Sequence, residues 1–430
     1  MARIDTLENF VTDVAAAIKD KTGNTETITP ANFDTEIASI ETGGSSYKIK
    51  DGRYFFYQGV RLDALEDIAP IAAFEDCTNM FGQTRNKSTV NVQNLDMSHA
   101  TKIDSMFQGC YELTTLDFSS WKTPNLVSMR SVFNGDSNLK TVNFKNVDTS
   151  KVTDMTALFA GCSKLTNLDI STFNTSSATT LAQLFSNCSA LTSVDLSHFD
   201  TTNVTSLSQM FNTCQALQSV NLSGWNTNKV TDITNLFANC SALTSLDVSH
   251  FNVENVNRCS TAFKRCSGIT SLDLSGWNMT KMTDMSYMFQ GCSKITELDL
   301  GGFRTSNVTT LQQTFAECME LTELDLSHFD TSQVTNLNQT FSACYGLTKL
   351  DLSGWDTSKV TNYAGTFMSC KSLQELDIRN FDFTKASSYS SVFSSIPVDC
   401  LIIVKDDTAK DWVLARRSDF TNVKTVAELA

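Results

Sequence analysis

The sequence predicts an α/β solenoid in which short units of one strand and one helical turn stack side by side. The first observation is a period, because thirteen of the 28 Phe residues stand 26 positions apart, from Phe81 to Phe393. The second is size, since a 26-residue unit cannot bury its own apolar face and must stack on its neighbours. The third is continuity. The repeat runs without a gap through most of the 430 residues and so replaces the two or three domains that such a length ordinarily suggests.

Each unit has the same internal pattern, numbered here from its Phe as position 0. Aliphatic residues stand at +6, +9 and +11, Asp or Asn at +10, and Trp or Phe at +14. The two-residue alternation of Leu298-Asp299-Leu300 predicts a strand with its aliphatic side chains inward and Asp outward. Cys at +3 and Met or Leu at −4 share helical spacing with the Phe, which predicts one or two helical turns.

The +6, +9 and +11 spacing is that of leucine-rich repeats, whose range of periods includes 26 residues. We therefore expect a right-handed leucine-rich-repeat solenoid with one continuous parallel sheet and capped ends, because strand-to-strand crossovers are right-handed. The array is expected to contain about twelve units and to bury every Phe at position 0.

Residues 1–46 differ from the repeat and predict two amphipathic helices followed by a linker. Asp5 with Glu8 forms a capping pair, and Thr29-Pro30 opens the second helix. Two such helices are too small to fold alone, so we expect them to anchor the chain to a partner. The apolar residues predicted to make this contact are Leu7, Phe10, Val11, Val14, Ile18, Phe33, Ile37 and Ile40.

The remaining boundaries follow from where the repeat begins and fades. Residues 47–75 contain two β-rich runs around Asp51-Gly52, which predicts a hairpin that caps the first unit. Residues 76–395 form the repeat array. In residues 396–430, a strand at 401–404 and a helix near 408–417 are expected to cap the other end, since an open end would expose the core and an unpaired sheet edge.

Ten of the 13 cysteines occupy position +3, nine of them in consecutive units from Cys162 to Cys370. An odd ladder cannot pair completely, and its neighbours are apolar, so we expect buried free thiols packed as small apolar side chains. Disulfides or a bound metal are the alternatives, although no C-x-x-C motif or His partner supports a zinc site. Unpaired thiols suit a protein made in a reducing cytoplasm. The ladder includes Cys266, Cys292, Cys318 and Cys344.

A ladder of acidic residues stands at position +10, with neighbouring carboxylates expected about 4.8 Å apart along the sheet. We expect hydrogen bonds from Ser at +12 and from nearby turn groups to compensate the repulsion. Calcium bridging is one alternative. Retaining glycoside hydrolysis is another, although an active site breaks a repeat whereas these residues constitute it. We predict no catalytic residue and no cofactor. The ladder includes Asp273, Asp299, Asp325 and Asp351.

Three of the four histidines, His198, His250 and His328, share position +13. Where this position is His the next residue is Phe, and after Gly224, Gly276 and Gly354 at this position the next residue is Trp. We interpret the exchange as volume compensation in a packed turn, because units this far apart cannot place two of these histidines on one metal ion.

Departures from the repeat pattern are the better candidates for partner binding. Positive charge gathers in one unit, and charged residues replace the usual Ser, Thr or Asn at +8 on the exposed strand face. Such a face, assembled from many units, is how solenoids bind extended partners. Ordinary solvated charge is the alternative for any single residue. The candidates are Arg258, Lys264, Arg265, Glu297, Glu323, Lys349 and Glu375.

Charge and hydropathy exclude two classes of partner. The net charge is −14 and the basic residues do not cluster, so we expect no nucleic-acid binding through phosphates. No apolar run is long enough to predict a membrane-spanning helix or membrane insertion.

The repeat, L-T-x-L-D-L-S-x-W/F-D-T-S-x-V-T-x-M-x-x-M-F-x-x-C, resembles the BspA-like leucine-rich repeats of bacterial surface proteins over residues 76–395. The resemblance implies a surface-exposed module for adhesion or interaction. Members of that family usually carry a secretion signal and an anchor, and neither is expected here. Residues 11–40 resemble the N-terminal segment of tail and other structural proteins of phages that infect Gram-positive bacteria. The closing segment from Ile403 to Trp412, with Val423, is similar to C-terminal caps in the same proteins and in BspA-like arrays.

These resemblances together predict a non-enzymatic phage virion protein, such as a tail fibre, that needs no secretion signal because lysis releases it. Its N-terminal helices would bind other virion proteins or another copy of the chain. Its array would bind a protein or glycan on the host surface. The alternative is a bacterial cell-surface adhesin of the BspA-like family.

Overall fold

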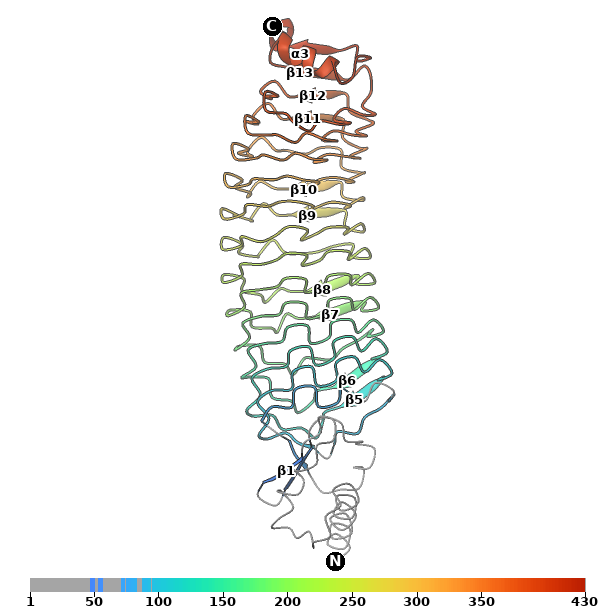
Figure 1. Cartoon of the computed structure of the whole chain (residues 1–430), viewed down its shortest axis with the longest axis vertical. Coiled ribbons are helices and arrows are strands. Elements are labelled where there is room, and N and C mark those ends of the chain that lie inside the picture. The colour runs from blue at the N-terminus through green and yellow to red at the C-terminus, as the bar shows by residue number, and fades with distance from the viewer. Residues whose placement is uncertain are drawn as a thin grey trace, which may run out of the picture. The chain divides into compact units, whose positions relative to one another are not determined.

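The computed structural model of the chain describes residues 47–50, 53–56, 71–73, 75–82, 87–93 and 95–429. The chain divides into two compact units, Met1–Ser177 and Ala178–Ala430, and each is described by itself. From here on, "unit" means one of these two parts of the chain, and the 26-residue element is called a repeat. In the second unit, successive repeats form coils that stack one above another, from green to red (Figure 1). The residues predicted to anchor the chain, from Leu7 to Ile40, lie outside the described residues.

The first unit contains one hairpin and two parallel strand pairs in its described residues. Strand β1 (Tyr47–Lys50) pairs antiparallel with β2 (Arg53–Phe56), around the Asp51-Gly52 dipeptide of the sequence. The parallel pairs are β3 (Ile71–Ala72) with β4 (Leu95–Asp96), and β5 (Thr115–Asp117) with β6 (Thr141–Asn143).

The second unit contains short parallel strands and two helices. The strands are β7 (Ser193–Asp195), β8 (Ser219–Asn221), β9 (Ser271–Asp273), β10 (Glu297–Asp299), β11 (Lys349–Asp351), β12 (Glu375–Asp377), β13 (Leu401–Val404) and β14 (Val423–Thr425). The helices are α3 (Asp407–Leu414) and α4 (Val426–Leu429). Strand pairing follows the repeat, as where Glu297 lies opposite Ser271.

The predicted parallel leucine-rich-repeat solenoid is confirmed within each unit, but its sheet is not continuous. In the described residues of the second unit the strands fall into separate sheets, β7 with β8, β9 with β10, and β11 to β14 in order. A strand of three residues forms few ladder hydrogen bonds, so pairing lapses wherever adjacent coils diverge slightly. The right-handed course stays a prediction.

The segment from −5 to +3, predicted as helical, is instead a series of turns that we call the turn ladder. Twenty non-glycine residues among those described have positive φ, and all stand at −2 or +2, as do Gln209 (58°) and Thr213 (64°). A right-handed helix needs negative φ at every residue, so this alternation excludes a helix. The helical prediction for this part of the repeat is therefore wrong.

Hydrogen bonds explain why the turn ladder replaces the helix. The N–H of Phe289 donates to Thr314 O of the next coil (3.0 Å), whereas the N–H of Met288 closes a turn onto Met285 O (3.2 Å). Alternate N–H groups therefore bind the next coil and the others bind their own. The next coil supplies an acceptor at every second residue, which replaces the intrahelical acceptor four residues back.

The core of each unit is a column of stacked Phe rings at position 0. In the second unit the centroids of successive rings lie 5.3–6.1 Å apart, and the rings are nearly parallel. Offset stacking of this kind adds to the burial of apolar area. Every Phe of the column is at most 2% exposed, as the sequence predicts.

The cysteines at +3 lie beside this column, and all 13 cysteines are buried free thiols. Nine of the ten ladder thiols in the described residues also donate S–H to the Phe carbonyl 29 residues earlier. The Sγ–O distance is 3.1 Å from Cys266 to Phe237 and 3.2 Å from Cys292 to Phe263, and Cys318 and Cys344 form the same contact with Phe289 and Phe315. Burial raises the pKa of the Cys292 thiol to about 12, so it stays protonated and able to donate.

The C-terminal end of the second unit adds a strand, a helix and a strand to the last repeat. Strand β13 lies between β12 and β14, and Figure 1 shows it next to β12 near the C-terminus. Helix α3 begins after Asp406, whose side chain accepts the N–H of Ala409 at 3.0 Å and so caps the first turn. Trp412 of α3 stacks on Phe383 with ring centroids 3.8 Å apart, which fixes the helix against the last repeat.

Candidate functional site

The candidate site is the strand face, defined as the exposed side chains at +8 and +10 in the second unit. In β9, for example, Ser271 and Asp273 are exposed while Leu272 between them is buried. This alternation follows from the two-residue period of a strand. The face carries Ser at +8 as far as Ser271 and charged residues from Glu297 onward.

The acidic ladder at +10 ends each strand with a hydrogen-bonded turn. The backbone N–H at +12 donates to Asp273, Asp299, Asp325 and Asp351 Oδ1, each at 2.9 Å. Two hydrogen bonds from Ser275 lower the pKa of Asp273. The bond from the Ser275 hydroxyl has the larger effect, and the bond from its backbone N–H the smaller. In each of the four residues one carboxylate oxygen is therefore committed to the turn, and the second oxygen takes no part in that hydrogen bond.

Two adjacent repeats combine acidic residues at both +8 and +10, where they line a hollow of about 710 Å³ that we call the acidic hollow. Its acidic lining residues are Glu297, Asp299, Glu323 and Asp325. Among the described residues, no Lys or Arg lies within ion-pairing distance of these four carboxylates. His328 also lines the hollow, and its Nε2 lies 2.9 Å from Leu300 O, which holds the ring in place.

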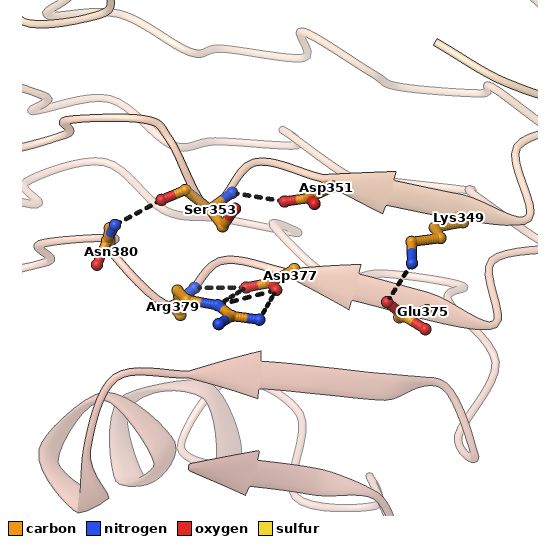
Figure 2. Close-up of polar contacts among 7 residues, drawn as sticks. All are labelled: Lys349, Asp351, Ser353, Glu375, Asp377, Arg379 and Asn380. Carbon is orange, nitrogen blue, oxygen red and sulfur yellow. Dashed lines mark hydrogen bonds and ion pairs between the residues drawn. The ribbon is translucent and has the colours of Figure 1, made fainter. Parts of the chain in front are cut away.

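The next two repeats carry charges that neutralise one another, as Figure 2 shows. Lys349 Nζ lies 2.8 Å from Glu375 Oε1 between β11 and β12, and this hydrogen bond raises the pKa of the lysine. Arg379 Nε binds Asp377 Oδ2 at 2.9 Å and covers this carboxylate, which is only 3% exposed. Unlike the acidic hollow, this end of the strand face has its charges internally paired.

The basic candidates lie on the turn ladder rather than on the strand face. Arg258 Nη1 lies 3.3 Å from Asp232 Oδ2, and Lys264 Nζ lies 4.8 Å from the centre of the Tyr287 ring. Arg265 stands at +2 with φ 57°. The structure thus assigns the seven predicted binding residues to three places: the acidic hollow, the ion pair between β11 and β12, and the turn ladder.

Sequence reasoning missed that the +10 carboxylates and His328 share the hollow with Glu297 and Glu323. The signal was present, because Glu297 and Glu323 each precede an Asp by two residues, and adjacent repeats place such pairs side by side. On sequence alone, the +10 ladder and the +13 histidines receive separate structural roles and are therefore not placed in one site.

The described part of the chain contains no arrangement of three or more His, Cys, Asp or Glu residues that could hold a metal ion. None of the described helices has both the length and the apolar character required to span a bilayer.

Comparisons with known proteins agree with a repeat array. The sequence profile of a family described as "Mycoplasma protein of unknown function, DUF285" matches four overlapping segments, residues 75–192, 137–223, 205–320 and 283–398. No curated protein matches the chain.

Several solved structures of leucine-rich-repeat type are similar to the chain. A leucine-rich cell surface protein from Faecalibacterium prausnitzii is 18% identical with a TM-score of 0.37, and the match covers 90% of this chain and 94% of that one. A leucine-rich repeat protein from Bacteroides ovatus is 17% identical with a TM-score of 0.36, over 90% of this chain and 100% of that one.

A third structure is the functional domain of InlJ from Listeria monocytogenes, described as including a cysteine ladder. It is 18% identical with a TM-score of 0.15, over 65% of this chain and 68% of that one.

Proposed function

The chain belongs to the DUF285 family, and we propose that it is a non-enzymatic binding protein that holds an extended partner along the strand face of its second unit. The observation that supports this proposal is the acidic hollow, which four carboxylates line with no Lys or Arg within ion-pairing distance among the described residues.

The chemistry of the acidic hollow favours a partner that presents cationic groups. The +10 carboxylates each use one oxygen in a turn, which leaves the second oxygen for a ligand. Glu297 and Glu323 have no such structural bond in the described residues, so a Lys or Arg side chain gains a charge-assisted hydrogen bond there. Stacked repeats present these groups at regular intervals, which suits an extended segment rather than a small molecule.

For the biological setting we propose adhesion at a bacterial cell surface, in line with the BspA-like repeat pattern. The earlier phage prediction rests on the two ends of the sequence and stays a prediction. The two settings separate in one experiment, which looks for the protein in washed envelopes of an uninfected culture and in purified virions.

A pair of matched variants tests the binding surface. Glu297→Gln with Glu323→Gln removes two charges from the acidic hollow, and Glu254→Gln with Glu320→Gln removes two exposed charges outside its lining. We expect the first pair to weaken binding of labelled protein to cells, and to arrays of basic peptides and glycans, by about tenfold or more. The control pair should leave binding unchanged. Equal effects of the two pairs would refute the assignment of the surface.

A further inference from the structure

The turn ladder of the second unit has a direction. Four N–H groups of a coil, at −4, −2, 0 and +2, donate to carbonyls of the following coil, except that the coil of Phe263 lacks the bond at −4. In the last complete step these bonds run from Tyr363 to Ser388, Gly365 to Ser390, Phe367 to Val392 and Ser369 to Ser394, with N–O distances of 2.6, 2.8, 3.0 and 2.7 Å. Because these bonds all point the same way, their peptide dipoles add along the stack, as they do along a helix. The C-terminal end of the turn ladder is therefore its positive end.

The last coil of the turn ladder, residues 389–395, has no following coil to accept its N–H groups. Within the described chain, the N–H groups of Tyr389, Ser391, Phe393 and Ser395 have no acceptor, although the equivalent groups of the preceding coil are all bonded. Ser391 (φ 57°) and Ser395 (φ 60°) alternate with right-handed neighbours. The alternate N–H groups of this coil therefore point out of one face of the turn ladder, where they can donate to an anion as the N–H groups of other anion-binding turns do.

A hollow of about 610 Å³ lies at these N–H groups, lined by residues 389–395 together with Arg416 and Arg417, which follow α3. The Arg416 guanidinium lies 3.9 Å from the Trp412 ring centre and 4.3 Å from that of Tyr389, so stacking holds it in place. Its Nη1 donates to Trp412 O at 3.1 Å, and its buried Nε has no acceptor in the described chain.

Arg417 completes one wall of the hollow. Its Nη1 donates to Phe393 O at 2.9 Å and its Nη2 to Ile396 O at 3.1 Å, while Asp419 Oδ1 accepts from its Nε at 2.6 Å. Asp419 therefore compensates the charge of Arg417. Arg416 has no carboxylate within ion-pairing distance among the described residues, which leaves one uncompensated cation beside the unpaired N–H groups.

We propose that this hollow, separate from the strand face, binds a phosphate- or sulfate-type oxyanion through the unpaired N–H groups and Arg416. A tetrahedral oxyanion offers several acceptor oxygens at once, so it can accept from neighbouring donors that point out of one face. The buried Arg416 Nε has no acceptor in the described chain, and an anion oxygen would supply one. An anion at this end is also favoured by the aligned dipoles of the turn ladder.

The test uses the full chain titrated with sodium phosphate or sodium sulfate at constant ionic strength in chloride. We expect saturable calorimetric binding and slower hydrogen exchange in a peptide that covers residues 389–395. Arg416→Gln should weaken phosphate binding at least about tenfold, since it removes a charge-assisted donor. The control Arg304→Gln removes an exposed arginine of the same unit that bonds only Gly301 O and Phe303 O, and it should leave binding unchanged.

Two further variants keep the proposal falsifiable if Arg416→Gln fails to fold. Arg416→Lys retains the charge and should retain part of the affinity, whereas Ser391→Asp places a carboxylate in the lining and should abolish binding. A parallel titration with glycerol phosphate distinguishes a site open to phosphate esters from one that admits only the free ion. The proposal is overturned if phosphate shows no saturable binding at millimolar concentration, or if Arg304→Gln weakens binding as much as Arg416→Gln.

Discussion

Positions +13 and +14 show how one residue pair satisfies a single buried carbonyl in two ways. Trp277 Nε1 donates to Val248 O at 2.9 Å, and where the pair is His-Phe, His250 Nε2 lies 3.1 Å from Leu222 O. Both acceptors stand at +11 of the preceding repeat. Gly at +13 is required beside Trp225, because a Cβ on Gly224 would lie 2.1 Å from a backbone oxygen. The sequence predicts the exchange as volume compensation, and the structure adds that the polar contact is exchanged too.

The indole hydrogen bond leads to a first prediction, on two buried tryptophans. Trp277 and Trp355 are each at most 1% exposed, yet Trp355 Nε1 has no acceptor in the described chain. Trp277→Phe removes one of the two hydrogen bonds to Val248 O, which keeps the bond from the Phe251 N–H, in addition to the lost volume, so it should destabilise the protein by about 1 kcal/mol more than Trp355→Phe. Urea denaturation of the two variants measures the difference. Equal losses would show that the indole N–H contributes nothing.

Asp136 leads to a second prediction, because it occupies position +3, where ten other repeats have Cys. Asp136 is fully buried, its Oδ1 accepts the N–H of Cys110 at 2.8 Å, and its Oδ2 has no partner in the described chain. Burial raises the pKa of Asp136 to about 8, although the N–H groups of Cys110 and Gly109 oppose the shift. The neutral acid is therefore the form that matches the protonated thiols of Cys110 and Cys162 on either side.

The sign of the pH effect follows from this shift. The folded chain binds the Asp136 proton more tightly than the unfolded chain, whose pKa is about 3.9, so stability falls as pH rises from about 4 to 8. We expect a loss of about 2–4 kcal/mol between pH 5 and 8. Asp136→Cys, which restores the thiol ladder, should remove this dependence. Denaturation curves at several pH values give the free energy of unfolding of the original protein and of Asp136→Cys. The same dependence on pH in both proteins would contradict the role assigned to Asp136.

Among the elements of the repeat, the sequence predicts the strands and their 26-residue register but not the turn ladder. Among the described residues, positions −4, 0 and +3 are buried except at Tyr389 in the last coil, so the apolar pattern is correct. That pattern records which side chains are buried and not which group accepts each N–H. A partial signal existed at −2 and +2, where Asn235, Asn239 and Gly291 are residues that tolerate positive φ.

A third prediction distinguishes the turn ladder from a helix. Ala343 at +2 has φ 58°, whereas Ala364 at −3 is not among the positive-φ residues, and both are half-buried. Ala343→Gly relieves left-handed strain and should stabilise the protein by about 1 kcal/mol, while Ala364→Gly should destabilise it by about 0.5–1 kcal/mol. A helical segment would instead lose stability with both substitutions. Thermal or urea denaturation measures the change in stability of each variant relative to the original protein.

Across the whole molecule, the candidate surfaces differ in how far the sequence could reveal them. Glu297 and Glu323 stand out because they break the repeat pattern, and they line the acidic hollow. Lys349 and Glu375 stand out for the same reason, but their pairing depends on the two facing each other across β11 and β12. The hollow at residues 389–395 depends on backbone N–H direction in the turn ladder, which no pattern of side chains records.

The last prediction concerns the N-terminal residues, which the sequence assigns to partner attachment. Residues 1–40 carry an apolar stripe on each of two expected helices, and the Gly-Gly-Ser-Ser run after them predicts a flexible connection. The β1–β2 hairpin and the repeats follow that run, so the array should not depend on the helices for its stability. We therefore expect residues 47–430, expressed alone, to remain a soluble monomer with a melting temperature close to that of the full chain, and to lose attachment to other subunits. Sedimentation velocity and thermal denaturation of the two proteins provide the comparison. A fragment that aggregates, or that melts far below the full chain, would mean that the helices cover the array itself and do not serve as an anchor.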